Sequence, residues 1–332
     1  MTPAILSVVV IGRNEEARLE ACLRSVWGMV DAGLALEVIY VDSGSTDDSV
    51  RLAEALGAFV IELGSNRPTA AMGRNAGWRA SRGMMVLFLD GDTVLDREFV
   101  WRALPAFADA TVAAVCGKRV ESRPLDSIYN RIFDLDWNGP AGETDYCGGD
   151  ALFRREALEA ADGYDSTLIA GEEPEMCTRL RLGGWKVIRI DAAMTSHDLA
   201  MRHAGQWWRR GIRTGYAYAQ IAARFAGTKI PLWSENVARN RNRMLAFAFL
   251  LLAGPVGLVL AGTYWLFAAA AGVFALLFLR TAFKARQKTR SWVTALLYGV
   301  HSHLQQVPIF VGRRRYARDV RGKVAGALIE YK

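Results

Sequence analysis

The chain has 332 residues, of which 52% are hydrophobic, so it is long enough for about two domains with a substantial core. Its formal net charge of +7 is unevenly distributed: residues 1–200 carry 20 Lys and Arg against 31 Asp and Glu, whereas residues 201–332 carry 21 against 3. Because the basic part also contains an uncharged apolar run, its expected partner is an anionic membrane surface and not nucleic acid. The four cysteines have no C-x-x-C spacing, which argues against both a disulfide framework and a zinc cluster.

Strand and helix patterns alternate along the first part of the chain. Strands are expected at 6–11, 36–41, 58–62 and 86–89, and amphipathic helices near 19–26, at 49–56 and at about 69–80. This alternation predicts an α/β fold, a mostly parallel sheet with right-handed crossovers and helices on its faces. The N-terminus shows no secretory signal, so the N-terminal half is expected in the cytoplasm.

Polar residues stand where three of these strands end. Asn14 and Glu15 follow the first strand, Asp42 follows the second, and Asp90 and Asp92 follow the fourth. In open α/β sheets ligands bind beyond the carboxyl ends of the strands, so these residues predict a nucleotide-sized crevice. Neither the G-x-G-x-x-G pattern of dinucleotide sites nor the P-loop pattern occurs in the sequence.

The segment Asp90-Gly91-Asp92 has two interpretations. Carboxylate oxygens suit Mg²⁺ or Mn²⁺, which commonly bridge one or two carboxylates to substrate phosphates. Asp-Gly is also a common hairpin signal, so the same residues taken alone are equally compatible with a turn.

Four ordered segments resemble the family 2 glycosyltransferases of GT-A fold: VVVIGRNEE (8–16), VDSGSTD (41–47), GRNAG (73–77) and LDGDT (89–93). The resemblance covers roughly residues 5–215. It implies an inverting transferase that uses a nucleotide-diphosphate sugar, with a UDP-sugar as the expected donor. A divalent ion, Mn²⁺ or Mg²⁺, would neutralise the leaving diphosphate.

The resemblance also implies roles for single residues. Asp42 would accept a hydrogen bond from the nucleobase, and Arg74 would lie close to the base and the diphosphate. Asp90 would contact the ribose side, and Asp90 and Asp92 would both be ligands of the metal. Asn14 and Glu15 would line the same nucleotide site. Without the family pattern, Arg74 is as well explained as a solvated helix residue.

Beyond residue 95 a helix is expected at 98–108 and a strand at 112–117, followed by an aromatic and acidic segment, 121–147, read as the acceptor region. The segment CGGDALFRR (147–155) resembles the part of the family that approaches the donor sugar. Asp150 would touch that sugar, and capping of a helix or turn explains the residue equally well.

Three carboxylates open a predicted helix at residues 172–175. From composition alone, complementation of the helix dipole explains them. The family, however, places its catalytic base in a Glu-Asp pair at this point, which implies Glu173 as the base with Glu172 in support. The second acid here is Glu and not Asp. Crowded carboxylates raise one another's pKa, as a base requires.

Two further candidates follow the last predicted strand, 186–190. His197 is a candidate third metal ligand, since a neutral imidazole binds Mn²⁺, and it is also compatible with a simple surface histidine. The segment Gln206-Trp207-Trp208-Arg209 resembles the acceptor-binding Gln-x-x-Arg-Trp motif of processive synthases, but Arg210 replaces the tryptophan. An interfacial helix with an aromatic belt is the alternative.

Residues 244–279 form a run of 36 without a charge, too long for one ordinary membrane span of about 20 residues. Cationic residues on both sides predict a two-span hairpin with both ends cytoplasmic. Gly254-Pro255 and residues 257–262 are the places where the helix could be interrupted. Residues 292–311 are interrupted by polar residues and predict an interfacial or re-entrant helix.

Together these patterns predict a GT-A catalytic domain at 1–200, with a nucleotide-binding half at 1–95 and an acceptor half at 96–200. Amphipathic interfacial helices at 201–243 and a membrane region at 244–332 would follow. The expected enzyme transfers a sugar to a lipid-linked acceptor in exopolysaccharide or envelope glycan synthesis at a bacterial inner membrane. The alternatives are transfer to polyprenyl phosphate itself and a non-catalytic membrane scaffold.

Overall fold

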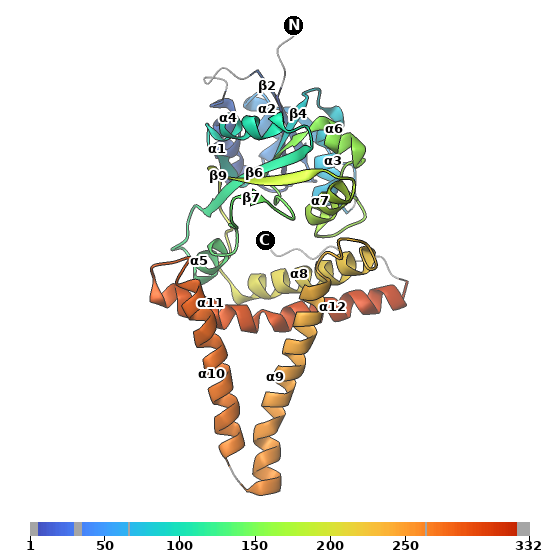
Figure 1. Cartoon of the computed structure of the whole chain (residues 1–332). Helices are drawn as coiled ribbons and strands as arrows, with labels where there is room; N and C mark the ends of the chain where they lie inside the picture. The colour runs from blue at the N-terminus through green and yellow to red at the C-terminus, as the bar shows by residue number, and fades with distance from the viewer. Residues whose placement is uncertain (1–5, 30–34, 66, 263, 324–332) are drawn as a thin grey trace. The chain divides into compact units, whose positions relative to one another are not determined.

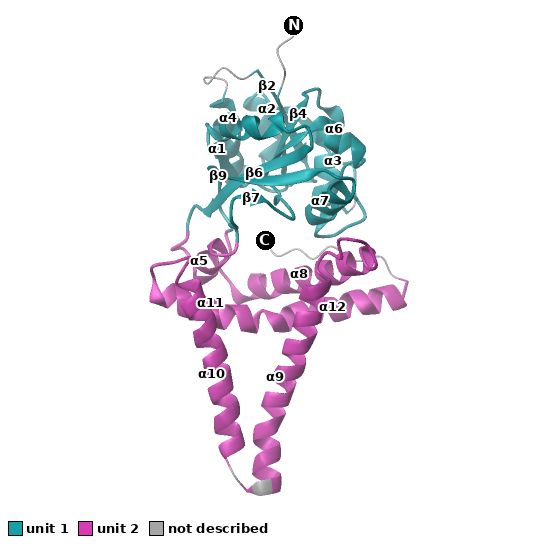
Figure 2. Ribbon diagram, in the orientation of Figure 1, with its two compact units in different colours: residues 1–123, 137–199 teal, residues 124–136, 200–332 magenta. Residues whose placement is uncertain are grey.

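The computed structural model describes residues 6–29, 35–65, 67–262 and 264–323. The first residues of the N-terminus, on which the expectation about a secretory signal depends, lie outside the described residues. The chain forms two compact units (Figures 1 and 2). Unit 1 consists of residues 1–123 and 137–199, and unit 2 consists of residues 124–136 and 200–332.

Unit 1 is built on a nine-stranded sheet with the order β3-β2-β1-β4-β8-β6-β9-β5, and β7 pairs with β9. The strands are β1 Leu6–Gly12, β2 Leu36–Asp42, β3 Phe59–Glu62, β4 Met85–Asp90, β5 Thr93–Leu95, β6 Val112–Glu121, β7 Gly142–Glu143, β8 Ala151–Arg154 and β9 Lys186–His197. The helical segments of this unit are α1 Glu16–Trp27, α2 Ser49–Ala55, α3 Ala70–Ala80, α4 Phe99–Ala103, the 3₁₀ helix η2 Leu104–Ala108, α6 Arg155–Ala160 and α7 Glu172–Leu182.

The four strands expected from apolar runs form the parallel part of this sheet. β1 pairs in parallel with β2 and with β4, and β2 pairs in parallel with β3. Val8, Val9 and Val10 of β1 have no exposed surface, because the central strand of such a sheet is covered on both faces. The expected α/β sheet flanked by helices is confirmed, and antiparallel pairs made by β5, β7 and β8 make it a mixed sheet.

The register of the parallel strands determines where the polar residues lie. Gly12 of β1 pairs with Asp42 of β2, and Ile11 of β1 pairs with Asp90 of β4. The carboxylates that follow separate stretches of sequence therefore meet at one edge of the sheet. β8 runs antiparallel beside β4, with Ala151 opposite Phe88, which brings the preceding Asp150 to the same edge.

Helix α3 lies directly on β1. A Cβ atom added at Gly77 would be 2.2 Å from Cγ1 of Val9, so glycine is required for this close approach. The side chain of Thr69 caps the helix and accepts a hydrogen bond from the Met72 N–H at 3.2 Å. Packing against the strand in this way fixes the position of Arg74 in the middle of α3.

The second half of unit 1 differs from the expected element boundaries. The helix expected at 98–108 is a short α helix that continues as the 3₁₀ helix η2, with Pro105 in its first turn. β6 continues to Glu121, and β9 continues past the expected Ile190 to His197. Long-range pairing between β6 and β9 extends both strands beyond their apolar runs.

Unit 2 contains the helices α5 Ile128–Asp134, α8 Ala204–Arg224, α9 Ser234–Ala261, α10 Trp265–Ala285, α11 Trp292–Leu304 and α12 Gln306–Arg321. Helices α8 and α12 pack closely through glycines. A Cβ at Gly215 would be 1.9 Å from the carbonyl oxygen of Ile309, and one at Gly312 would be 2.0 Å from that of Ile212. The amide of Asn240 in α9 joins this pair, since it donates to the Gln306 carbonyl at 2.9 Å and accepts from Arg313 at 2.7 Å.

Helices α9 and α10 form a hairpin (Figure 1). By length and composition, residues 234–260 and 265–285 are long and apolar enough to cross a membrane, and little of either is buried within the structure. The chain turn lies at Gly262, which has φ of 61°, and Pro255 stands inside α9. Of the two predicted break points, the Gly-Pro pair is therefore wrong and the glycine at the end of 257–262 is correct.

Candidate active site

Asp42 is held by the turn that follows β2. One carboxylate oxygen accepts hydrogen bonds from the backbone N–H groups of Gly44 and Ser45 at 2.9 and 2.7 Å. The other accepts from the Ser45 hydroxyl and from the Tyr40 hydroxyl, the latter at 3.2 Å. Asp42 is 1% exposed, and its hydrogen bonds fix the turn as a rigid wall beside the strand end.

Asn14 and Glu15 connect this turn to the end of β1. The Asn14 amide oxygen accepts from the Thr46 N–H at 2.8 Å, and the Asn14 N–H donates to the Ser45 hydroxyl at 2.8 Å. The Glu15 N–H donates to the Ser49 hydroxyl at 2.9 Å. Asn14 adopts φ of 55°, a left-handed conformation that asparagine tolerates. The two loops are thus tied together by the residues expected to line the nucleotide site.

Arg74 connects three elements of unit 1. Its guanidinium is 2.7 Å from Asp90 at the end of β4 and 2.9 Å from Glu172 at the start of α7. The side chain is 3% exposed and lies over the ring of Tyr164, with 5.7 Å from the guanidinium carbon to the ring centroid. Burial raises the pKa of Asp90, but Arg74 and Arg119 overcome this effect and hold it below its ordinary value.

Asp150 and Arg119 complete the same network. Arg119 donates to one oxygen of Asp150 at 2.6 Å, and the Thr195 hydroxyl donates to that oxygen at 2.8 Å. The other oxygen of Asp150 accepts from the Asp90 N–H at 3.0 Å. Arg119 also approaches Asp90 at 3.5 Å. The network joins β4, β6, β9 and the loop before β8, with two arginines against Asp90, Asp150 and Glu172. Arg74 and Asp150 are buried, whereas Asp90, Arg119 and Glu172 are partly exposed.

Asp92 and His197 form a second buried group at this edge. The His197 Nε2 atom is 3.3 Å from an oxygen of Asp92, and the two residues are 6% and 4% exposed. Antiparallel pairing of β5 with β9 sets Thr93 opposite His197, and the Trp137 ring packs edge-on against the imidazole with centroids 5.0 Å apart. Two ligands at right angles on an ion, each about 2.1 Å from it, would be about 3 Å apart. The spacing therefore fits a divalent ion, and a carboxylate oxygen with an imidazole nitrogen suits Mn²⁺ better than Mg²⁺, which prefers oxygen ligands.

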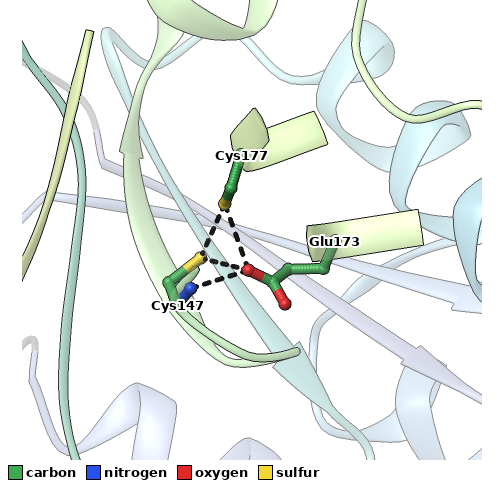
Figure 3. Close-up of side chains that lie close together, drawn as sticks. All are labelled: Cys147, Glu173 and Cys177. Atoms are coloured by element: carbon green, nitrogen blue, oxygen red, sulfur yellow. Dashed lines mark hydrogen bonds between the residues drawn. The ribbon is translucent and has the colours of Figure 1, made fainter. Parts of the chain in front are cut away.

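Glu173 lies beside Cys147 and Cys177 (Figure 3), whereas Glu172 pairs with Arg74. Its Oε1 atom accepts hydrogen bonds from the Cys147 N–H at 2.7 Å and from the thiols of Cys147 and Cys177, each at 3.1 Å. The side chain is buried, and burial raises the pKa of Glu173, although these hydrogen bonds partly oppose the shift. A carboxylate with a raised pKa has the basicity that proton abstraction from a hydroxyl requires.

The four candidate acceptor residues belong to unit 2, where two of them have clear structural contacts. The Gln206 side chain caps α8, because its oxygen accepts from the N–H groups of Arg202 and His203 at 2.8 and 3.0 Å. The Trp207 indole donates to Nδ1 of His301 at 2.9 Å. Trp208 and Arg209 are exposed.

Comparison with known proteins identifies the family of one part of the chain. Residues 7–161 match the model of Glycosyl transferase family 2. The chain carries a family 2 glycosyltransferase domain. Pre-mycofactocin glycosyltransferase of Mycobacterium tuberculosis is 29% identical over 246 residues, which are 68% of this chain and 49% of that protein. The O-antigen chain rhamnosyltransferase WbaN of Salmonella anatum is 26% identical over 178 residues, covering 49% of this chain and 56% of WbaN. The chain spans about half the length of these curated relatives.

Solved structures support the same fold. The mannosyltransferase PcManGT of Pyrobaculum calidifontis, solved with GDP-Man and Mn²⁺, has a TM-score of 0.59 at 23% identity, covering 96% of this chain and 88% of that one. Residues 1–349 of Staphylococcus aureus TarS have a TM-score of 0.51 at 16% identity, covering 96% of this chain and 91% of TarS. The expected GT-A fold is confirmed, and the family match at residues 7–161 supports the expected enzyme class, a glycosyltransferase.

Sequence reasoning missed Arg119 and the cysteine pair of this glycosyltransferase domain. The strand expected at 112–117 ends before Arg119 and therefore leaves this residue outside the predicted sheet. The sequence feature that could have pointed to Arg119 is the basic pair Lys118-Arg119 directly after an apolar strand. Cys147 and Cys177 are 30 residues apart, so no short sequence pattern predicts the contact between their sulfur atoms. The argument from spacing against a metal-binding cysteine cluster was therefore incomplete.

Proposed function

We propose that this chain is an inverting, metal-dependent glycosyltransferase that moves a sugar from a nucleotide-diphosphate sugar to a lipid-linked saccharide. The observation that carries this proposal is the buried pair of Asp92 and His197, 3.3 Å apart, beside the network of Asp90, Asp150 and the two arginines. This arrangement offers a hard cation site and fixed positive charge at the sheet edge where nucleotides bind in α/β folds.

The residues divide the chemistry among them. Asp42, with Asn14 and Glu15, forms the nucleobase wall, and Arg74 balances charge beside the diphosphate. Asp92 and His197 would hold Mn²⁺ or Mg²⁺, and the ion would neutralise charge that develops on the departing diphosphate. Asp90 would contact the ribose and would not hold the ion, because Arg74 and Arg119 already approach its two oxygens.

Glu173 acts as the general base in this scheme. It takes the proton from an acceptor hydroxyl, whose oxygen bonds to the anomeric carbon as the bond from that carbon to the diphosphate oxygen breaks. The base and the leaving group act on opposite sides of the anomeric carbon, so its configuration inverts. Glu172 supports the base through its ion pair with Arg74, which connects the start of α7 to the donor side.

Unit 2 supports a lipid-linked acceptor. A cavity of about 710 Å³ is lined by Arg239 and Arg243 of α9, by Arg280 and Lys284 of α10, and by apolar side chains including Phe247. Cations beside apolar walls suit a phosphate attached to a hydrocarbon chain. The same cavity is also compatible with the second candidate function, which is transfer of the sugar to polyprenyl phosphate itself. We place the enzyme at a bacterial inner membrane with its catalytic domain in the cytoplasm.

The test uses membranes that contain the full chain, a panel of nucleotide sugars and Mn²⁺. We expect radiolabelled sugar to enter the lipid fraction, and Asp92→Asn to lower this transfer by roughly 10²-fold or more. Intact transfer by Asp92→Asn would overturn the metal-dependent mechanism. Product analysis separates the candidates, because a lengthened lipid-linked oligosaccharide supports the first and a single sugar on lipid phosphate supports the second. Failure to bind any nucleoside diphosphate with metal present would favour the non-catalytic scaffold.

A further inference from the structure

Cys147, Glu173 and Cys177 bring three potential metal ligands to one point (Figure 3). Cys147 lies in the loop before β8, and the other two residues are one turn apart on α7. Their ligand atoms all lie within 4.8 Å of one another, and the side chains are 6%, 5% and 0% exposed in chain order. This trio is unlike the site at Asp92 because two of its three donors are sulfur atoms.

The distances in the trio are close to those of a tetrahedral zinc site. Zinc–sulfur bonds of about 2.3 Å set two thiolates about 3.8 Å apart, and a carboxylate oxygen about 3.5 Å from each sulfur. The observed separation of the two Sγ atoms is 3.7 Å, and Oε1 of Glu173 is 3.1 Å from each of them. An ion would therefore require the carboxylate oxygen to move by only a few tenths of an ångström relative to the sulfurs.

We propose that Cys147, Glu173 and Cys177 bind a thiophilic divalent cation of the Zn²⁺ class. The two thiols release their protons to solvent as the two sulfur–metal bonds form, and Glu173 binds through Oε1. A water molecule takes the fourth tetrahedral position. Thiolate ligands select zinc-like ions, and the site at Asp92 and His197 has no sulfur donor, so a thiophilic ion is expected to prefer the cysteine trio.

Burial raises the pKa of both thiols, that of Cys177 to about 11, so they are protonated at neutral pH without an ion. A bound cation deprotonates a coordinating thiol outright. Binding is therefore coupled to proton release, which gives a readout independent of enzyme activity.

The site has a regulatory consequence that rests on the proposed function. If Glu173 is the general base, a cation on its Oε1 atom withdraws charge from the carboxylate and lowers its basicity at both oxygens. Zinc-class ions then inhibit sugar transfer in the presence of saturating Mn²⁺, whereas the hard ion at Asp92 is required for it. The enzyme would thus be inhibited by one class of ion and activated by another.

The direct test is titration of CdCl₂ into the purified full chain in detergent, after chelation and with a phosphine reductant that leaves thiols free. We expect the ultraviolet cadmium–thiolate absorption band to saturate at about one ion per chain, with release of roughly two protons to a pH indicator. Cys147→Ser and Cys177→Ser should each weaken binding by about tenfold or more. Cys22 is a buried cysteine outside the trio, so Cys22→Ser should bind cadmium as the wild type does.

Absence of a saturable band in the wild type, or its loss in Cys22→Ser to the same extent, would overturn the proposal. Circular dichroism checks that each variant is folded, and Cys177→Ala provides a second variant without a hydroxyl. In transfer assays Zn²⁺ should inhibit the wild type and spare Cys177→Ser. A cadmium band in a chain without transferase activity would leave the metal site standing and refute the proposed function, whereas active enzyme without the band would refute only the metal site.

Discussion

Nε2 of His197 lies 3.3 Å from a carboxylate oxygen of Asp92, although His197 ends β9 and Asp92 lies more than a hundred residues earlier, directly before β5. Antiparallel pairing of β5 with β9 creates this neighbourhood. Both side chains are buried, so their proximity is fixed by the sheet and not by chance contact at the surface.

The first prediction concerns these two residues. His197→Ala and Asp92→Asn should each lower sugar transfer by roughly 10²- to 10³-fold, because each removes a ligand of the ion that stabilises the leaving diphosphate. Isothermal titration should also show that Mn²⁺ no longer strengthens nucleoside diphosphate binding. Asp162→Asn is the matched control, since the Asp162 side chain is 95% exposed. Equal losses in the control would contradict the prediction.

The second prediction compares two neighbouring cations on β6. Arg119→Met should destabilise the chain by about 3 kcal/mol, because it leaves the buried carboxylate of Asp150 without its charged partner. Lys118→Met should cost at most about 1 kcal/mol, because its ion pair with Asp191 is exposed. Thermal unfolding in detergent measures both. Similar melting temperatures for the two variants would show that the Arg119 pair contributes no more than a surface pair.

The third prediction concerns pH and Glu173, whose pKa is raised by burial. Activity should fall on acidification at a pH above the ordinary glutamate value, since the base must be ionised. The stability that the protonated carboxyl provides is present below the unfolded pKa and is lost as pH rises through the folded pKa. Glu173→Gln should therefore abolish transfer yet be more stable than the wild type at high pH. A variant that is inactive because it is unfolded would contradict this interpretation.

The fourth prediction uses two glycines of α8. Gly215→Ala should destabilise unit 2 by about 2 kcal/mol, because the added Cβ would meet the Ile309 carbonyl and push α12 away. Gly205→Ala, in the first turn of the same helix, meets nothing within 4 Å and should be neutral or stabilising by up to about 1 kcal/mol. Protease resistance and thermal unfolding provide the comparison. Equal tolerance at both positions would mean that α8 and α12 are not held in this close contact.

The parallel part of the sheet was predictable because its strands are continuous apolar runs with polar residues at their ends. Those runs place Asp42 and Asp90 correctly at one sheet edge, and the apolar face of α1 at Leu19, Cys22, Leu23 and Val26 is buried as expected. A strand buried on both faces leaves a strong local signal, so no long-range information is needed.

The remaining features depend on partners that are distant in sequence. Arg119 enters the site because β6 is extended by pairing with β9, and Cys147 meets Cys177 because a loop before β8 lies against α7. Gln206 was expected to bind an acceptor, but local helix capping already uses its side chain. Neither strand extension nor contact between a loop and a helix is encoded in a short pattern of residues.

Arg74 contacts Asp90 on the donor side and Glu172 on the helix that carries Glu173. One cation therefore serves two carboxylates, and a third anion that engages it must compete with both. In the proposed mechanism, a donor diphosphate that draws Arg74 toward itself would weaken the ion pair at the first turn of α7, which also carries Glu173. Donor binding would then change the surroundings of the proposed base before an acceptor binds, and we expect the donor to bind first.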